Sequence, residues 1–172
     1  MFELTKQKSK LSSVNPLAEL HGEDKKLAVD LVFEMKVSND VLSFFDPSLK
    51  SALYKANYNT AGQAELIQEA GHLPQLKFPK MGAIKCGYEG AGYEVTVHYG
   101  VSGKDDIRLT ETQIDGFKFD CQDGGTVGVR FRVIAHPDTP ELGRLCELIQ
   151  REVDITVEPP SAEAQQDLKE AD

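Results

Sequence analysis

Five basic side chains and two tyrosines are the residues of this chain whose types and spacing suggest chemistry. They are Arg108, Lys118, Arg130, Arg132, His98, Tyr93 and Tyr99. Basic groups bind phosphates and carboxylates through charge-assisted hydrogen bonds, and exposed tyrosine rings stack on the bases of single-stranded nucleic acid. We therefore treat these residues as a candidate surface for an anion or a nucleic acid. The simpler interpretation is that Asp120, Glu94 and Asp106 neutralise the basic groups and that the tyrosines pack at strand edges.

Two segments with alternating apolar residues predict the hairpin that would position these groups. The segments are 116–121 and 126–134, and the turn residues 123–125 separate them. Alternation with a period of two is typical of half-buried strands. A three-residue loop would keep both apolar sets on one face, whereas a two-residue turn would send one set into water.

The register of this hairpin follows from the requirement that both apolar sets enter one core. Opposed residues of an antiparallel pair point to the same face. The expected opposed pairs are Phe119 with Val129, Phe117 with Phe131 and, on the outer face, Lys118 with Arg130. Arg132 would lie one step further along the outer face, so this register gathers positive charge on one side of the sheet.

Other segments predict further strands and three short helices. The expected strands are 2–8, 27–37, 76–78, 83–88, 93–99, 107–112 and 153–158. Helices are expected after the capping acids Asp40, Asp46 and Asp138. The last helix should bury a stripe at helical spacing, made of Leu142, Leu145, Cys146 and Ile149. The pattern indicates a mainly β fold: an antiparallel β-sandwich or partly open barrel with two or three peripheral helices, with α+β as the alternative.

The length of 172 residues suits one domain with a sizeable core. We expect residues 1–158 to form a single β-rich domain with a helical or irregular insertion at about 39–72, in which 54–71 is a mobile surface segment. Residues 159–172 carry four acids and one base. We expect them to form an acidic, disordered tail.

Composition and motifs argue against several classes of protein. No apolar run approaches the roughly 18–20 residues of a membrane-spanning helix, and the N-terminus lacks the apolar core of a secretory signal. Cys86, Cys121 and Cys146 are too scattered for a disulfide framework and fit a reducing cytoplasm. No GxSxG, HExxH or Walker motif occurs, and no long helix follows the glycine-rich segment 87–92. We expect no cofactor, no metal site and no membrane partner.

Several short stretches resemble small, uncharacterised proteins encoded by tailed bacteriophages and prophages. These stretches are 19–24, 39–42, 49–54, 124–127 and 132–137. The resemblance covers most of the chain except the tail. It implies the cytoplasm of a bacterial host and a role in phage replication, recombination, host takeover or assembly. It implies no particular activity, catalytic residue or cofactor.

We expect a non-enzymatic binding or accessory protein that acts through a β-sheet face or edge on a protein partner, or that self-associates as a homo-oligomer. One alternative is a single-stranded nucleic-acid-binding protein in phage recombination or replication, with the basic groups on phosphates. A second alternative is a small metal-dependent enzyme using His98, His136 or Cys121.

Overall fold

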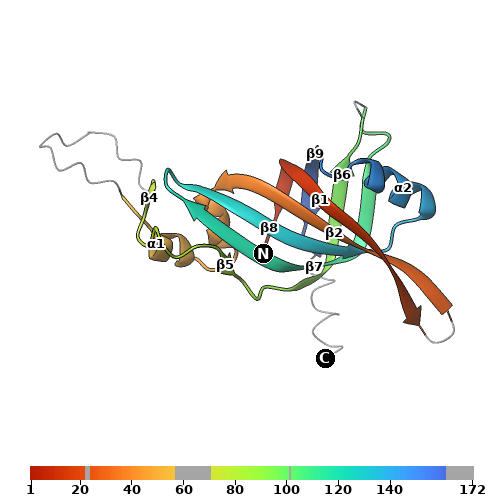
Figure 1. Ribbon diagram of the computed structural model, residues 1–172, viewed down its shortest axis with the longest axis horizontal. Coiled ribbons are helices and arrows are strands. Elements are labelled where there is room, and N and C mark those ends of the chain that lie inside the picture. The colour runs from red at the N-terminus through yellow and green to blue at the C-terminus, as the bar shows by residue number, and fades with distance from the viewer. Residues whose placement is uncertain (22–23, 57–70, 101, 162–172) are drawn as a thin grey trace, which may run out of the picture.

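The computed structural model describes residues 1–21, 24–56, 71–100 and 102–161 (Figure 1). The strands are β1 (Leu4–His21), β2 (Asp24–Ser38), β3 (Tyr54–Lys55), β4 (Gln75–Leu76), β5 (Ile84–Lys85), β6 (Gly90–His98), β7 (Ile107–Gln122), β8 (Thr126–Ala135) and β9 (Glu152–Glu158). The helices are the 3-10 helix η1 (Asn39–Phe44), α1 (Leu49–Leu53) and α2 (Thr139–Glu147).

The fold is mainly β, which confirms the predicted class. Seven strands form one sheet in the order β5-β7-β6-β9-β1-β2-β8, and additional pairing between β7 and β8 closes a ring of six of them. All neighbouring strands in this sheet are antiparallel. The ring is not a regular barrel, because β1 pairs with β9 along its first part and with β2 along the rest.

The inside of the ring holds the hydrophobic core. In β8, every second residue is buried: Val127, Val129, Phe131, Val133 and Ala135. Phe117 and Phe131 stack with ring centroids 5.4 Å apart, and Phe2 packs edge-on against Phe117 at 5.1 Å. Aromatic rings bury large apolar surfaces, so this cluster contributes strongly to core stability.

The β7–β8 hairpin has the predicted register near its loop. Phe119 opposes Val129, Lys118 opposes Arg130, and a three-residue loop joins the strands. Both glycines of the loop have positive φ angles, 89° and 78°. Glycine adopts this region without the steric penalty of a Cβ atom, which is why the chain can reverse here in the register that buries both apolar sets.

A bulge interrupts one predicted pair of this hairpin. The register shifts between Asp115 and Lys118, so Gly116 and Phe117 together face Phe131 and no one-to-one pair forms there. Gly116, with a φ of 66°, lies in the shift. The prediction assumed an uninterrupted ladder, whereas an extra residue on one strand bends it and changes the pairing beyond that point. Both rings still face the core.

Several predicted strands have different bounds in the structure. Segments 107–112 and 116–121 belong to the single strand β7, and 76–78 and 83–88 shorten to β4 and β5. The first strand runs to His21, well beyond the predicted 2–8. Alternating lysines near its start made this strand difficult to recognise, because they lie on its solvent side and leave few apolar residues in this part of the sequence.

Helix α2 begins as predicted, with a capping box centred on Asp138. Its buried side is only partly as predicted. Leu145 and Leu148 are buried, whereas Cys146 and Ile149 are exposed. The helical spacing cannot place Ile149 against the core because the helix ends before that residue.

Helix α1 begins two residues later than the predicted cap implies. Ser48 is the residue before the helix, and Asp46 accepts a hydrogen bond from the backbone N–H of Ser48 at 2.7 Å. Asp46 therefore orders the turn that leads into α1 without capping the helix itself. The start of η1 is capped by Ser38, whose hydroxyl accepts a hydrogen bond from the backbone N–H of Asp40.

Much of the predicted insertion and most of the predicted tail lie outside the described residues, at 57–70 and 162–172. Tyr54, at the edge of the predicted surface segment, is a core residue with 1% exposure. Its hydroxyl lies 3.0 Å from the carbonyl oxygens of both Gln122 and Thr126. Burial raises the pKa of the Tyr54 phenol.

No helix within the described residues is long and apolar enough to cross a membrane.

Candidate binding groove

An open groove with a volume of about 630 Å³ crosses the outer face of four strands. Its walls come mainly from 7–10 of β1, 34–36 of β2, 128–130 of β8 and every second residue of 118–122 in β7, and Ala83 and Glu152 complete the lining. Successive side chains of a strand point to opposite faces. The long polar side chains of the groove therefore point out of the ring, while their apolar neighbours fill the core.

Positive charge dominates the groove. The cationic side chains that line it are Lys8, Lys10, Lys36, Lys118 and Arg130, and the acidic ones are Glu34, Asp120 and Glu152. The Arg130 Nε lies 3.6 Å from a Glu34 carboxylate oxygen. The four lysines form no ion pair with any residue that the structure describes. The groove is thus locally basic on a chain of net charge −9.

The strand register aligns the charges of the groove in a row. Lys10 opposes Glu34, Glu34 opposes Arg130, and Arg130 opposes Lys118. Lys85 of β5 continues the row beyond Lys118. Like charges directly opposite each other destabilise a sheet, so the Arg130–Lys118–Lys85 part of the row is an arrangement that a bound anion would relieve.

A glycine deepens the middle of the groove. Gly128 lies on the outer face of β8 between Lys36 of β2 and Asp120 of β7. A Cβ atom at this position would lie 3.4 Å from the Asp120 Cβ. Without that atom, the space between the flanking side chains stays open to a ligand.

The predicted site is only partly assembled at this groove. Of the seven predicted residues, Lys118 and Arg130 line it, and the remaining five lie elsewhere. Sequence reasoning missed Lys8, Lys10 and Lys36. The alternation of lysines in the first strand was the available signal, but only the tertiary pairing of β1 with β2 brings them beside β8.

Arg132 is held by two carboxylates on the same outer face. Its Nε and Nη2 donate to the two Asp115 oxygens at 2.7 and 2.6 Å, and its Nη1 lies 3.3 Å from Asp30. The hydrogen bonds from Arg132 to Asp115 raise the pKa of the guanidinium above its ordinary range. A bidentate pair of this kind fixes the side chain, so Arg132 braces β7, β8 and β2.

Arg108 and His98 also have acidic partners. The Arg108 Nε lies 3.0 Å from Glu94. The His98 Nδ1 lies 2.8 Å from Asp106, and its Nε2 lies 2.8 Å from the Thr156 hydroxyl. The hydrogen bond from His98 lowers the pKa of the Asp106 carboxyl, and the backbone N–H of Tyr99 adds to the effect. The interpretation that Glu94 and Asp106 neutralise neighbouring basic groups agrees with these contacts.

The predicted tyrosines occupy two different environments. Tyr93 is 1% exposed, and its hydroxyl lies 2.7 Å from that of Tyr88. A buried ring cannot stack on a base, so Tyr93 is removed from the candidate surface. Tyr99 is half-buried near α2, with its hydroxyl 3.5 Å from Glu147, and it does not line the groove.

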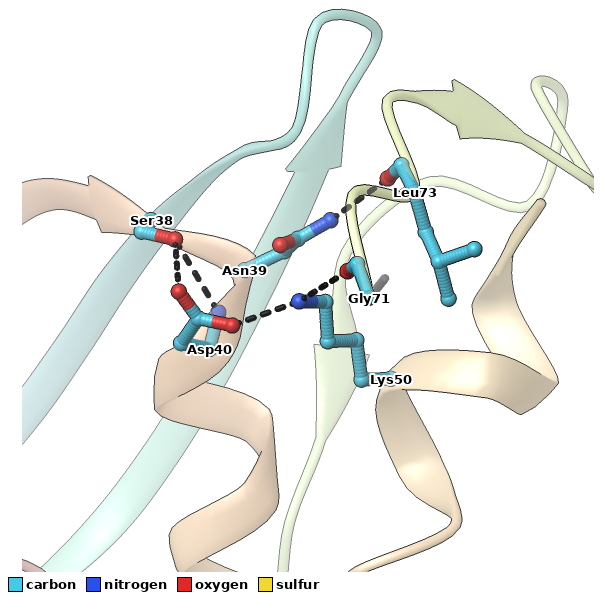
Figure 2. Close-up of polar contacts among 6 residues, drawn as sticks. All are labelled: Ser38, Asn39, Asp40, Lys50, Gly71 and Leu73. Atoms are coloured by element: carbon cyan, nitrogen blue, oxygen red, sulfur yellow. Dashed lines mark hydrogen bonds and ion pairs between the residues drawn. The ribbon is translucent and has the colours of Figure 1, made fainter. Parts of the chain in front are cut away.

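A second hollow, of about 520 Å³, lies where the end of β2 meets the β7–β8 loop. Figure 2 shows its polar contacts: the Lys50 ammonium bonds the Asp40 carboxylate and the Gly71 carbonyl, and the Asn39 amide donates to the Leu73 carbonyl at 2.8 Å. Hydrogen bonds from Lys50 and Ser38 lower the pKa of Asp40. These groups satisfy one another and fasten residues 71–73 to the ring, so we assign them a structural role.

Within the described residues, no three His, Cys, Asp or Glu side chains are grouped so that they could hold a metal ion. Comparisons with protein families, with curated proteins and with solved structures find no match for this chain.

Proposed function

We propose that this chain is a non-enzymatic binding protein and that its basic groove receives an acidic segment of a protein partner. The observation that carries the proposal is the gathering of five cationic side chains from four strands around one hollow. Four of these are lysines without an ion-pair partner in the described part of the chain. Complementary charge favours the correct partner and accelerates its encounter with the protein.

The lining of the groove favours a peptide over a nucleic acid. Among the described residues, no aromatic side chain lines it, whereas single-strand binders usually stack bases on aromatic rings. Its acids, among them Glu34 and Asp120, would repel a continuous run of phosphates but would tolerate a peptide with spaced charges. Met35 and the alkyl stems of the lysines add apolar contact surface.

The test is fluorescence anisotropy with a labelled peptide of alternating glutamate and valine. We expect binding that weakens as salt rises. The triple variant Lys8→Glu, Lys10→Glu, Lys36→Glu should weaken it by about tenfold or more. The control variant Lys55→Glu, Lys80→Glu, Lys104→Glu changes the net charge equally at exposed positions outside the groove. Equal affinity of both variants, or no binding by the native protein, contradicts the proposal.

Single-stranded nucleic acid is the second candidate, because unpaired lysines also bind phosphates. A labelled oligothymidine in the same assay separates the two. Tighter binding of the oligonucleotide than of the peptide, with a steep salt dependence that is lost in the groove variant, would favour this candidate. The setting of a bacteriophage-infected cell stays a prediction from sequence resemblance.

A further inference from the structure

The groove contains an incomplete edge of the sheet. Beyond the Lys10–Glu34 pair, β1 turns away from β2 and pairs only with β9 (Figure 1). Residues 35–38 of β2 keep β8 as their ladder partner on one side, and no strand of the described chain pairs with them on the other. No other backbone-to-backbone hydrogen bond compensates for this within the described chain.

An unpaired strand edge offers backbone donors and acceptors to any extended chain that reaches it. Proteins commonly protect such edges with lysine side chains, and Lys36 has that effect here. Protection alone, however, does not explain why further cations from β1, β8 and β7 surround the same edge. The charges around the edge and the backbone groups within it suit one kind of ligand, an extended acidic peptide.

We propose that the acidic segment binds as an additional β-strand along residues 35–38 of β2. The inference rests on the proposed function and specifies how the segment would be held. Strand addition combines main-chain hydrogen bonds, which supply affinity, with alternating side-chain contacts, which supply specificity.

The alternation of β2 defines the sequence class of the peptide. Met35 is buried and Val37 is half-buried on the inner face, whereas Lys36 is exposed on the outer face. Opposed residues of paired strands share a face. The peptide residue opposite Lys36 is therefore acidic, and its neighbours opposite Met35 and Val37 are apolar. A short segment that alternates apolar and acidic residues meets both requirements.

A second copy of this chain is a poorer occupant of the same edge. Two copies of β2 paired through residues 35–38 would bring the two Lys36 side chains onto one face of a short ladder. Like charges so placed repel. The acidic peptide provides the opposite charge at that position.

Backbone methylation of the peptide tests the inference directly. In an added strand, successive N–H groups point alternately toward and away from the neighbouring strand. Two methylated forms of the glutamate–valine peptide are made, one on odd and one on even amides. One form should lose about tenfold or more in affinity, and the other should bind nearly as well as the parent peptide.

Amide hydrogen exchange provides the second measurement. The Asn39 N–H donates to Gly125 of the β7–β8 loop, so by alternation the amides of Lys36 and Ser38 face the open edge and those of Met35 and Val37 face β8. Bound peptide should slow exchange at Lys36 and Ser38 by about tenfold or more, with little change in β6 on the far part of the ring. If both methylated forms bind like the parent and exchange at 35–38 is unchanged, while the lysine variant still weakens binding, strand addition is wrong and the proposed function stands. If the parent peptide does not bind, the proposed function itself fails. A dimer that protects 35–38 without peptide also overturns the inference.

Discussion

Arg130 and Arg132 are two residues apart on the same outer face of β8, yet their partners give them different roles. Arg132 donates to both oxygens of Asp115 and reaches Asp30. Among the described residues, Arg130 has Glu34 as its one acidic partner, at 3.6 Å, and both side chains of that pair are about half exposed. A pair with this geometry contributes little to stability, so Arg130 can exchange its partner for a ligand. Arg132 cannot, because leaving its partners would strand two buried or half-buried carboxylates without their cation.

Phe131 should be among the residues most sensitive to truncation. It is fully buried and packs against Phe117, Phe2 and Phe33. Phe131→Ala should lower the free energy of unfolding by about 3–5 kcal/mol, measured by urea denaturation. Phe78→Ala is the matched control, because Phe78 is 53% exposed, and it should change stability by less than about 0.5 kcal/mol. Similar effects of both substitutions would contradict the assignment of the core.

Asp106 should make folding sensitive to acid. Its pKa is lowered from an ordinary 3.8, chiefly by the hydrogen bond from His98. When the pKa of a carboxyl group is lower in the folded protein than in the unfolded chain, the ionised group stabilises the fold at a pH above its unfolded-state pKa. This stabilisation is lost as the pH falls through the folded-state pKa. The free energy of unfolding should therefore decrease below about pH 4, and Asp106→Asn should reduce this decrease. The neighbouring Asp105→Asn is the control, and an identical pH profile for both variants would argue against the assignment.

Strand β1 is the element that determines the irregular shape of the ring. It begins as the neighbour of β9 and continues as the neighbour of β2. A register shift between Leu4 and Gln7 interrupts its pairing with β9, and Lys6 within it has a φ of 44°. The Thr156 hydroxyl accepts the Lys6 backbone N–H at 3.2 Å. The irregularity in the β1–β9 ladder is therefore hydrogen-bonded in place.

Substituting alanine for Gly125 of the β7–β8 loop and for Gly143 of α2 should change the free energy of unfolding in opposite directions. Gly125 has a φ of 78°, and an added Cβ would lie 3.4 Å from the Asn39 amide nitrogen. Gly125→Ala should lower the free energy of unfolding by roughly 1–2 kcal/mol. Gly143 lies within α2 with no described atom near its Cβ position, so Gly143→Ala should raise the free energy of unfolding by about 0.5–1 kcal/mol. Thermal denaturation of both variants checks the signs, and stabilisation by Gly125→Ala would contradict the loop geometry.

At the scale of the whole molecule, local pattern predicted local structure well. The period of two identified β2, β8 and β9, and the capping acid identified the start of α2. The local sequence pattern could not predict that β1 would lie between β9 and β2, because that arrangement depends on contacts between residues far apart in the chain. The groove is missed for the same reason: Lys8 and Lys118 are remote in sequence and meet only after the ring has closed.

The pairing of β1 with β9 also sets a condition on how this chain is made. Lys6 and Thr156 are 150 positions apart and hydrogen-bonded, so the ring cannot close until nearly the whole described chain has left the ribosome. Folds that depend on such distant partners form slowly, and their unpaired strands are exposed to aggregation in the meantime. The lysines of β1 keep the nascent strand hydrated during this delay, so the charge that surrounds the finished groove also protects the chain before the groove exists.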